Sequence, residues 1–132
     1  MNYNNNKLFI DNIQVNRIIK KFGTPIYCYS YNQLKKNILN FQKHFTDINP
    51  LICFAVKANN NTKILNEISK LGLGADVVSK GELMAAIKAK INPKKIVFSG
   101  VGKTYEELEF AIKNKILLIN TESKSEIETI LK

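Results

Sequence analysis

The sequence predicts an α/β fold, namely the first four βα units of a (β/α)8 barrel of the TIM type, preceded by an N-terminal strand and helix segment. Two observations lead to this prediction. Four short apolar runs are each followed by an amphipathic stretch, and the runs recur at a fixed interval. If Lys57, Val78, Ser99 and Asn120 mark equivalent strand ends, each step is 21 residues long. Such a short and regular βα repeat favours a closed barrel over an open sheet.

Each apolar run is predicted as a strand, and each amphipathic stretch as a helix. The strands span residues 51–56, 75–78, 95–98 and 116–119, and the helices begin near residues 61, 80, 105 and 124. Short connections lead from every strand into a helix and back to the next strand. The strands are therefore expected to be parallel, with right-handed crossovers.

Helix starts carry a recurring signal, the capping box, in which two side chains satisfy free backbone amides at the first turn. Three matches follow predicted strands directly: Ser79-x-x-Glu82, Thr104-x-x-Glu107 and Ser123-x-x-Glu126. A fourth, Ser30-x-x-Gln33, opens an earlier helix that is predicted to run to about Phe45. The three matches after apolar runs support the alternation of strands and helices.

Side chains alternate between the two faces of a strand, so the 21-residue register assigns each residue to a face. One predicted face is wholly apolar and suits packing under helices. It contains Phe54, Val56, Val77, Ile96, Phe98, Leu117 and Ile119. The other face carries polar groups near the strand ends, as the mouth of a barrel would. It contains Cys53, Ala55, Lys57, Asp76, Val78, Val97, Ser99, Leu118 and Asn120.

Two regions are predicted along the chain: an N-terminal segment at residues 1–30, and the first half of a barrel at residues 31–132. A complete barrel usually needs about 250 residues. We therefore expect the rest of the barrel to be absent, as in a truncated gene product, a split gene or a cut chain. A half barrel expressed alone would expose two sheet edges and the barrel interior, so we expect poor solubility or self-association.

Composition excludes several functional classes. The net charge is +9, but the lysines are scattered over every predicted helix and no nucleic-acid motif is present, so we expect no nucleic-acid partner. No apolar stretch is long enough to span a bilayer, and no signal peptide precedes the fold, so a cytoplasmic protein is expected. Cys28 and Cys53, both in runs that suggest strands, are predicted to be reduced structural thiols, and no metal site is predicted. The single histidine, His44, is predicted to be a surface or helix-packing residue.

Lys57 is the leading candidate for chemistry. It ends a strongly apolar run and would lie at the C-terminal mouth of a barrel, where TIM-type enzymes place their active sites. Burial at such a place would lower the pKa of the amine and suit a lysine that condenses with a carbonyl group. The alternative from position alone is a lysine that extends from a strand end into solvent.

Four segments occur in the order seen in a known family. They are Phe-Gly-Thr-Pro-Ile-Tyr (22–27), Phe-Ala-Val-Lys-Ala-Asn (54–59), Gly-Ala-Asp-Val-Val-Ser-Lys-Gly-Glu-Leu (74–83) and Ile-Val-Phe-Ser-Gly-Val-Gly-Lys-Thr (96–104). The chain resembles diaminopimelate decarboxylases, within the wider group of barrel-type decarboxylases and alanine racemases that use pyridoxal phosphate. The resemblance runs from about Phe9 to the last residue and is strong because the segments occur together.

The resemblance implies decarboxylation of meso-diaminopimelate to lysine with pyridoxal 5′-phosphate as cofactor. It implies a (β/α)8 barrel followed by a C-terminal β domain, in a homodimer with active sites at the subunit interface. Lys57 matches the catalytic lysine that binds the cofactor covalently, and Asp76 and Ala55 are implied to lie near the cofactor. Glu82 also matches a family carboxylate, although its capping role is sufficient to explain it.

Several functional groups of the family would lie beyond Lys132: the phosphate site, the acid partner of the pyridine nitrogen, the substrate-binding arginine, the stacking histidine and the partner subunit's cysteine. The segment Gly100 to Thr104 lacks the spacing of a P-loop and is predicted to be a tight turn into a helix. We therefore expect these residues alone neither to decarboxylate nor to hold the cofactor tightly. The alternatives are an ornithine or arginine decarboxylase of the same group, a small pyridoxal-phosphate-binding protein, and a non-catalytic remnant or split-enzyme partner.

Overall fold

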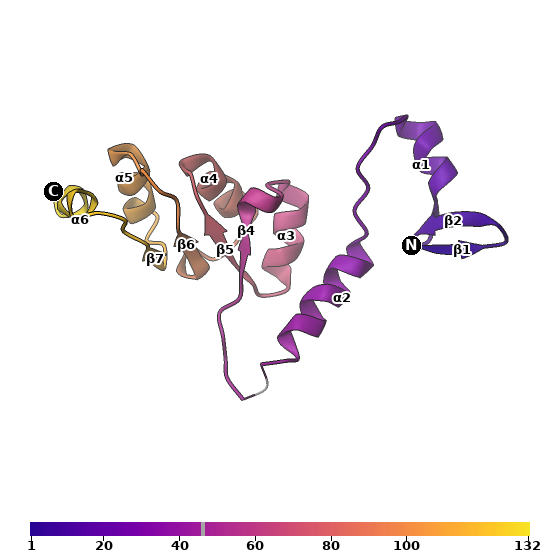
Figure 1. Cartoon of the computed structure of the whole chain (residues 1–132), viewed down its shortest axis with the longest axis horizontal. Helices are drawn as coiled ribbons and strands as arrows, with labels where there is room; N and C mark the ends of the chain where they lie inside the picture. The colour runs from indigo at the N-terminus through magenta and orange to yellow at the C-terminus, as the bar shows by residue number, and fades with distance from the viewer. Residues whose placement is uncertain (46) are drawn as a thin grey trace. The chain divides into compact units, whose positions relative to one another are not determined.

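A computed structural model describes residues 1–45 and 47–132. The chain divides by its contacts into two units, Met1–Asn49 and Pro50–Lys132, which are described separately below. Figure 1 labels their elements. The expected division into an N-terminal segment at residues 1–30 and a half barrel at residues 31–132 stays a prediction.

The first unit begins with three short antiparallel strands in the order β1-β2-β3. Their bounds are β1 Asn2–Asn4, β2 Lys7–Ile10 and β3 Ile13–Gln14. Asn4 pairs with Lys7, so only Asn5 and Asn6 form the first turn, with φ of 48° and 57°. Two consecutive positive φ values match the turn that best fits the twist of a hairpin, and asparagine tolerates them well.

Two helices follow, α1 at Val15–Phe22 and α2 at Tyr31–Gln42. Helix α1 ends at Gly23, whose φ of 79° is a conformation that glycine adopts readily. The Ser30 hydroxyl accepts a 3.0 Å hydrogen bond from the amide of Gln33, which confirms the predicted start of α2. The end predicted near Phe45 is wrong by three residues, because the chain leaves the helix after Gln42.

Ser30 also links α2 to the strand region, because its Oγ donates a 2.5 Å hydrogen bond to Oδ1 of Asp11. This bond is the main cause of a lowered pKa of Asp11. Cys28 lies between the helices in a segment without a strand and is exposed, so the strand expected around it is wrong. No described residue of this unit is buried.

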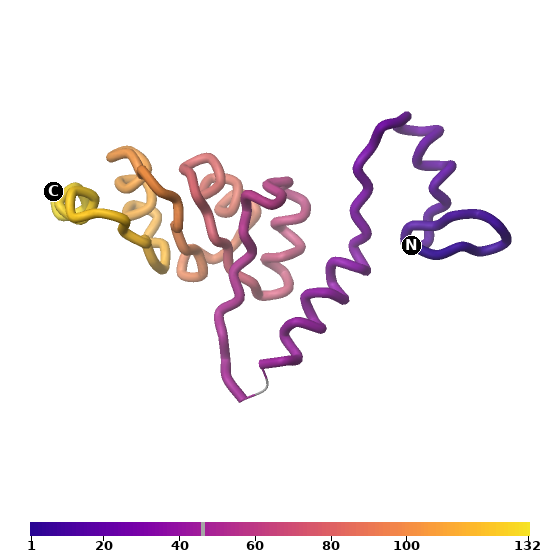
Figure 2. The backbone as a smooth tube through the Cα atoms, in the orientation of Figure 1, coloured from indigo at the N-terminus to yellow at the C-terminus, as the bar shows by residue number. Residues whose placement is uncertain are grey.

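The second unit alternates strands and helices, as Figure 2 lets the reader follow. The strands are β4 Cys53–Ala55, β5 Gly74–Val77, β6 Ile96–Phe98 and β7 Leu118–Ile119. They form one parallel sheet in the order β4-β5-β6-β7. Ala55 pairs with Asp76, Asp76 with Val97, and Val97 with Leu118. Every pair is separated by 21 residues, so the predicted register is confirmed.

Three α-helices and two short 3-10 turns connect the strands of this unit, and a fourth helix follows β7. The helices are α3 Thr62–Lys70, α4 Lys80–Lys88, α5 Tyr105–Lys113 and α6 Lys124–Ile130, and the turns are η1 Val56–Ala58 and η2 Pro93–Lys95. The unit thus contains the four predicted βα repeats.

The core lies between one sheet face and the helices. Its buried side chains come from strands, helices and connecting turns alike: Val56, Leu65, Ile68, Leu73, Ala75, Val77, Leu83, Ala86, Ala89, Ile91, Ile96, Phe98, Leu108 and Ala111. Burying one large side chain of this kind stabilises a fold by about 1.5–3 kcal/mol. On the opposite face, Ala55, Asp76 and Val97 are half-buried and Leu118 is exposed. The two predicted faces are therefore distinct, although Leu117, expected under helices, is 48% exposed.

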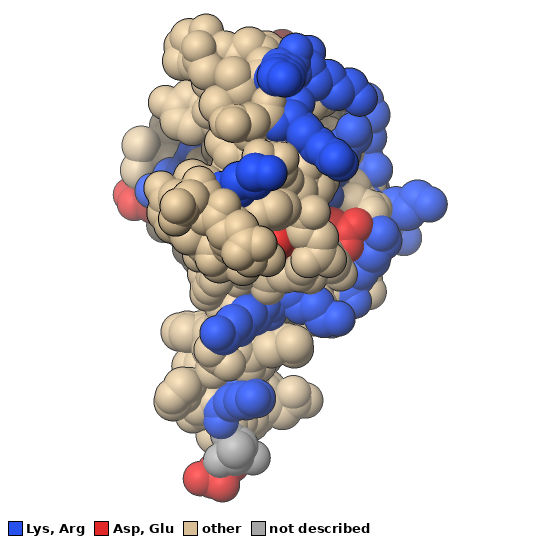
Figure 3. Space-filling view, turned by 90° about the vertical axis from the view of Figure 1, so that its right-hand side faces the viewer, with Lys and Arg blue, Asp and Glu red and all other residues tan. Residues whose placement is uncertain are grey.

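Basic side chains outnumber acidic ones in the sequence, and Figure 3 shows them at several separate places on one face. None of the described helices has the length and apolarity needed to cross a bilayer. Within residues 1–45 and 47–132, no cluster of histidine, cysteine and carboxylate side chains could bind a metal ion. The absence of a nucleic-acid partner and the cytoplasmic location stay predictions.

Candidate active site at the strand ends

The candidate site lies at the C-terminal edge of the parallel sheet, where the predicted polar residues come together. The ladder continues past the strands, because the amide of Ser99 bonds to the carbonyl of Val77 at 2.9 Å and that of Asn120 to Phe98 at 2.9 Å. Ser99 and Asn120 therefore keep the 21-residue register beyond β6 and β7. In a barrel, this edge is the one that carries the active site.

Lys57 lies in the turn η1 and not at the end of the strand. Strand β4 stops at Ala55, and the amide of Asn59 closes the turn on the carbonyl of Val56 at 3.0 Å. The strand predicted through Val56 is thus too long, although Val56 is buried in the core as expected. The turn contacts β5 and α4, so Lys57 remains beside the neighbouring strand end.

The side chain of Lys57 is exposed, so the burial expected around its amine is absent from this chain. Among the described residues, none forms a hydrogen bond or ion pair with it. Within the described residues, the amine of Lys57 thus has no partner that a ligand would need to displace.

Asp76 lies on β5 and pairs with Ala55 of β4 across the ladder. Its Oδ1 accepts a 2.5 Å hydrogen bond from Oγ of Ser99, and no ion pair joins it to Lys57. Asp76 is thus a strand carboxylate whose neighbouring partner is a hydroxyl, and its expected place near the cofactor stays a prediction. Half-buried Cys53 lies on the same face, and the pKa of its thiol is raised by burial and by the charge of Asp76.

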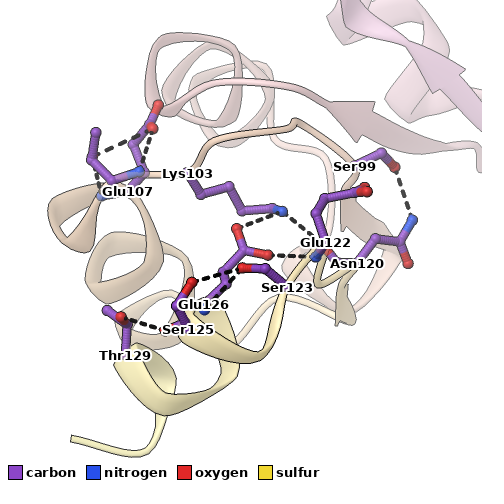
Figure 4. A network of polar contacts seen from close by, with 10 residues as sticks. Ser99, Lys103, Glu107, Asn120, Glu122, Ser123, Ser125, Glu126 and Thr129 are labelled. Carbon is purple, nitrogen blue, oxygen red and sulfur yellow. Dashed lines mark hydrogen bonds and ion pairs between the residues drawn. The ribbon is translucent and has the colours of Figure 1, made fainter.

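Ser99 and Asn120 extend this contact across β6 and β7. The side-chain amide of Asn120 donates a 3.3 Å hydrogen bond to Oγ of Ser99 (Figure 4). Asp76, Ser99 and Asn120 thus form one hydrogen-bonded series over three adjacent strands. Sequence reasoning assigned all three to one face but did not join them, although their shared register was the signal.

Lys103 fixes the end of β7 from the loop before α5. Its Nζ donates a 2.5 Å hydrogen bond to the backbone carbonyl of Asn120 and lies 3.1 Å from Oε1 of Glu126 (Figure 4). The other oxygen, Oε2, accepts 2.7 Å from the amide of Glu122. The pKa of Glu126 is lowered, mainly by this backbone bond and also by Lys103. Sequence reasoning missed the ion pair because nothing in either local pattern names its partner.

Glu82 begins α4 in a modified capping arrangement. Ser79 accepts a 3.3 Å bond from the amide of Glu82, as predicted, but Oε2 of Glu82 accepts from the amide of Val78 at 2.9 Å. The carboxylate thus stabilises the end of the strand one residue before the cap. This bond occupies one oxygen of Glu82 and supports its structural role.

Glu107 forms a complete capping box with Thr104 and bridges two helices. Its Oε2 accepts a 3.1 Å hydrogen bond from the backbone amide of Thr104. Its Oε1 accepts one of 2.9 Å from the backbone amide of Lys80 at the start of α4. These two backbone bonds are the main cause of its lowered pKa. Glu107 therefore couples the first turns of α4 and α5.

The glycine-containing loop after β6 is a tight turn into α5, as predicted. A Cβ on Gly100 would lie 2.4 Å from the carbonyl oxygen of Val78, so only glycine fits there. Gly102 has a φ of 63°, and Thr104 caps the helix. The backbone of this loop is thus explained by packing.

His44, just past α2, is exposed, and its Nδ1 lies 2.8 Å from the backbone carbonyl oxygen of Asn40. It is therefore a surface residue, one of the two places predicted for it.

Most of the chain matches the model of a known protein family. Residues 11–132 match the family described as "Pyridoxal-dependent decarboxylase, pyridoxal binding domain". The chain belongs to this family. The partial barrel, the register and the polar strand ends described above are therefore those of a pyridoxal-dependent decarboxylase domain.

Several relatives of this chain are named diaminopimelate decarboxylase. The diaminopimelate decarboxylase of Aquifex aeolicus is 43% identical over 130 residues, which cover 98% of this chain and 30% of that protein. A crystal structure of diaminopimelate decarboxylase from M. jannaschii superposes with a TM-score of 0.93 at 38% identity, over 98% of this chain and 31% of that one. The structure of diaminopimelate decarboxylase from Helicobacter pylori complexed with L-lysine superposes with a TM-score of 0.84 at 44% identity. The match covers 88% of this chain and 29% of that one.

The chain spans about 30% of the length of the curated relatives it matches. The likeness to solved structures confirms the predicted fold class, the first part of a barrel with parallel strands. The roles expected for Lys57, Asp76 and Ala55 are untested and stay predictions.

Proposed function

We propose that this chain is the N-terminal part of the cofactor-binding barrel of a diaminopimelate decarboxylase, with Lys57 as the lysine that binds pyridoxal phosphate. One observation carries the proposal. Lys57 lies in the turn η1 that follows the first strand of a half-barrel and contacts β5, and its exposed side chain has no partner among the described residues. A free amine at the catalytic edge of this fold suits condensation with an aldehyde.

The residues around Lys57 fit such a cofactor. Asp76 lies one strand away and has one oxygen held by Ser99, and its ladder partner Ala55 carries a small side chain. The loop from Ser99 to Thr104 approaches β5 closely through Gly100. When bound, pyridoxal phosphate supplies the electron sink for loss of a substrate carboxylate. The chain itself supplies the attachment point and a fixed negative charge.

The substrate proposal rests on the relatives and not on a pocket. The most similar relatives are named diaminopimelate decarboxylases, and one solved structure of that name is complexed with L-lysine. Removal of one carboxylate from meso-diaminopimelate yields lysine, so a lysine-binding site agrees with this reaction. We further propose a homodimer as the active assembly.

Genetic complementation tests this function. The gene that encodes residues 1–132 is expressed in bacteria that need lysine because they lack diaminopimelate decarboxylase. We expect the complete protein encoded by this gene to restore growth. The same protein with Lys57→Ala should fail to restore growth, and so should residues 1–132 expressed alone. The last failure is expected because the chain spans about 30% of its relatives. Growth with Lys57→Ala would contradict the proposal.

The alternatives predict other outcomes of the same test. Rescue of a strain that lacks ornithine or arginine decarboxylase, without rescue of the lysine auxotroph, would favour another substrate. Rescue that requires an adjacent reading frame would favour a split enzyme. No rescue of any strain by the complete protein would favour a non-catalytic remnant.

A further inference from the structure

We infer that Ser99 is a positioning residue for Asp76: its hydroxyl, held by Asn120, fixes one oxygen of that carboxylate beside the cofactor lysine. The inference deepens the proposed function and rests on it for the role of Asp76. Ser99 itself need not touch a ligand.

Geometry places Ser99 where it can act on Asp76. Asp76 pairs with Val97 across β5 and β6, and Ser99 stands two residues further along on the same face. The backbone bond from Ser99 to Val77 holds this register past the end of β6. The 2.5 Å separation of Oγ and Oδ1 is that of a hydroxyl bound to a charged acceptor.

The direction of the hydrogen bonds is fixed by the donors present. A serine hydroxyl has one proton, and an ionised carboxylate can only accept, so Ser99 donates to Asp76. In the 3.3 Å contact, Oγ must then accept a hydrogen bond from Asn120. The amide nitrogen of Asn120, and not its amide oxygen, therefore faces Ser99. A hydroxyl that accepts one hydrogen bond donates a stronger one.

Asn120 is itself held from behind. Nζ of Lys103 donates to the backbone carbonyl oxygen of Asn120 and pairs with Glu126, and the two charged side chains are only 1% and 7% exposed. Figure 4 shows Lys103 reaching across to Asn120 and Glu126. The series from Lys103 to Asp76 therefore starts at a buried ion pair and ends on a carboxylate at the open face.

The other oxygen of Asp76 remains free for a ligand. No residue in the described ranges bonds to Oδ2, and no described side-chain polar atom is both buried and without a partner. Oδ2 is therefore accessible, while Oδ1 is held in place. A carboxylate fixed on one side loses less side-chain entropy when a ligand binds the other.

The test compares four variants of the chain: Ser99→Ala, Ser99→Thr, Asp76→Ala and the control Ser69→Ala. Ser69 also donates to an oxygen, the carbonyl of Lys90 at 2.7 Å, but lies in the last turn of α3 at the opposite end of the unit. Two quantities are measured. NMR coupling constants report whether Asp76 keeps one χ1 rotamer, and borohydride trapping reports the pyridoxal phosphate concentration that half-saturates Lys57.

We expect Asp76 to keep one rotamer in the wild type, Ser99→Thr and Ser69→Ala, and to average over rotamers in Ser99→Ala. The half-saturating concentration should rise about tenfold or more in Ser99→Ala, the effect of losing one hydrogen bond to a charged group. Asp76→Ala should raise it at least as much. Ser99→Thr, which keeps the hydroxyl, should restore the wild-type value, an outcome that a merely structural role does not require.

The two readouts separate the inference from the proposed function. Rotamer averaging of Asp76 in the wild type, or an unchanged rotamer in Ser99→Ala, overturns the inference whatever the trapping shows. An ordered Asp76 that Ser99→Ala disorders, without any trapping at Lys57, supports the contact and overturns the proposed function. Weak binding by Asp76→Ala together with wild-type binding by Ser99→Ala overturns the positioning role.

Discussion

Lys103 and Glu126 form an ion pair with 3.1 Å between nitrogen and oxygen, and their side chains are only 1% and 7% exposed. The pair joins the loop before α5 to the first turn of α6. Nζ also lies 5.7 Å from the ring centroid of Phe98, which is fully buried. Because both charges lose water on folding, their mutual contact decides whether this part of the chain can fold with them inside.

Replacement of Lys103 should therefore be costly. We expect Lys103→Met to lower the free energy of unfolding by about 3 kcal/mol, because the carboxylate of Glu126 would stay buried without its cation. Urea denaturation measures the change. Lys124→Met is the control, since Lys124 pairs with Glu128 at 3.7 Å with 90% and 59% of the side chains exposed, and it should cost less than about 1 kcal/mol. Equal effects would contradict the account.

Acid should weaken the fold through Glu107. Its pKa in the folded chain lies below the ordinary 4.5, so the ionised carboxylate stabilises the fold. This stabilisation is fully present above about pH 4.5 and is lost as the pH falls through the lower folded value. We expect Glu107→Gln to be less stable at pH 7 and to lose less stability between pH 5 and about 3. Denaturation at several pH values, with exposed Glu106→Gln as control, checks this.

Two glycines should respond oppositely to the same substitution. Gly100→Ala should destabilise the chain by about 2 kcal/mol or more, because the new Cβ would lie 2.4 Å from the carbonyl oxygen of Val78. Gly81→Ala, near the start of α4, meets nothing closer than 3.8 Å and should stabilise it by up to about 1 kcal/mol. Thermal unfolding followed by circular dichroism compares the two. Tolerance of Gly100→Ala would mean that the loop does not pack as described.

The chain expressed alone should self-associate. Apolar side chains remain exposed near the far strand and the loop before α5, with Leu117, Leu118 and Val101 at 48%, 50% and 79%. The strands β4 and β7 also have one unpaired edge each within the described sheet. Sedimentation velocity should show dimers or larger species that Leu118→Lys reduces. A single monomeric species for the wild type would contradict the expectation.

The sheet could be predicted from the sequence because its repeat is regular. A constant step of 21 residues determines which residues pair, and Ala55, Asp76, Val97 and Leu118 are aligned as expected. Helix starts were predicted for the same reason, since a capping serine or threonine and its carboxylate lie within four residues of each other. Local patterns of this kind need no knowledge of the rest of the chain.

Contacts between distant loops could not be predicted in that way. Lys103 lies in the loop before α5 and Glu126 in the first turn of α6, and a sequence with many lysines does not show which one is buried. The end of β4 was also missed by one residue, because nothing in the apolar run marks where the turn η1 begins. The exposure of Lys57 depends on what surrounds η1 in space, which no local pattern contains.

The central claim is that the amine of Lys57 binds pyridoxal phosphate, and reductive trapping tests it most directly. The chain is mixed with pyridoxal phosphate, reduced with borohydride and mapped by peptide mass spectrometry, beside Lys57→Arg and the control Lys63→Arg, which changes an exposed lysine in α3. We predict one dominant modified peptide that contains Lys57, is lost in Lys57→Arg and is unchanged in Lys63→Arg. Modification spread over many surface lysines, and unaffected by Lys57→Arg, would contradict the claim.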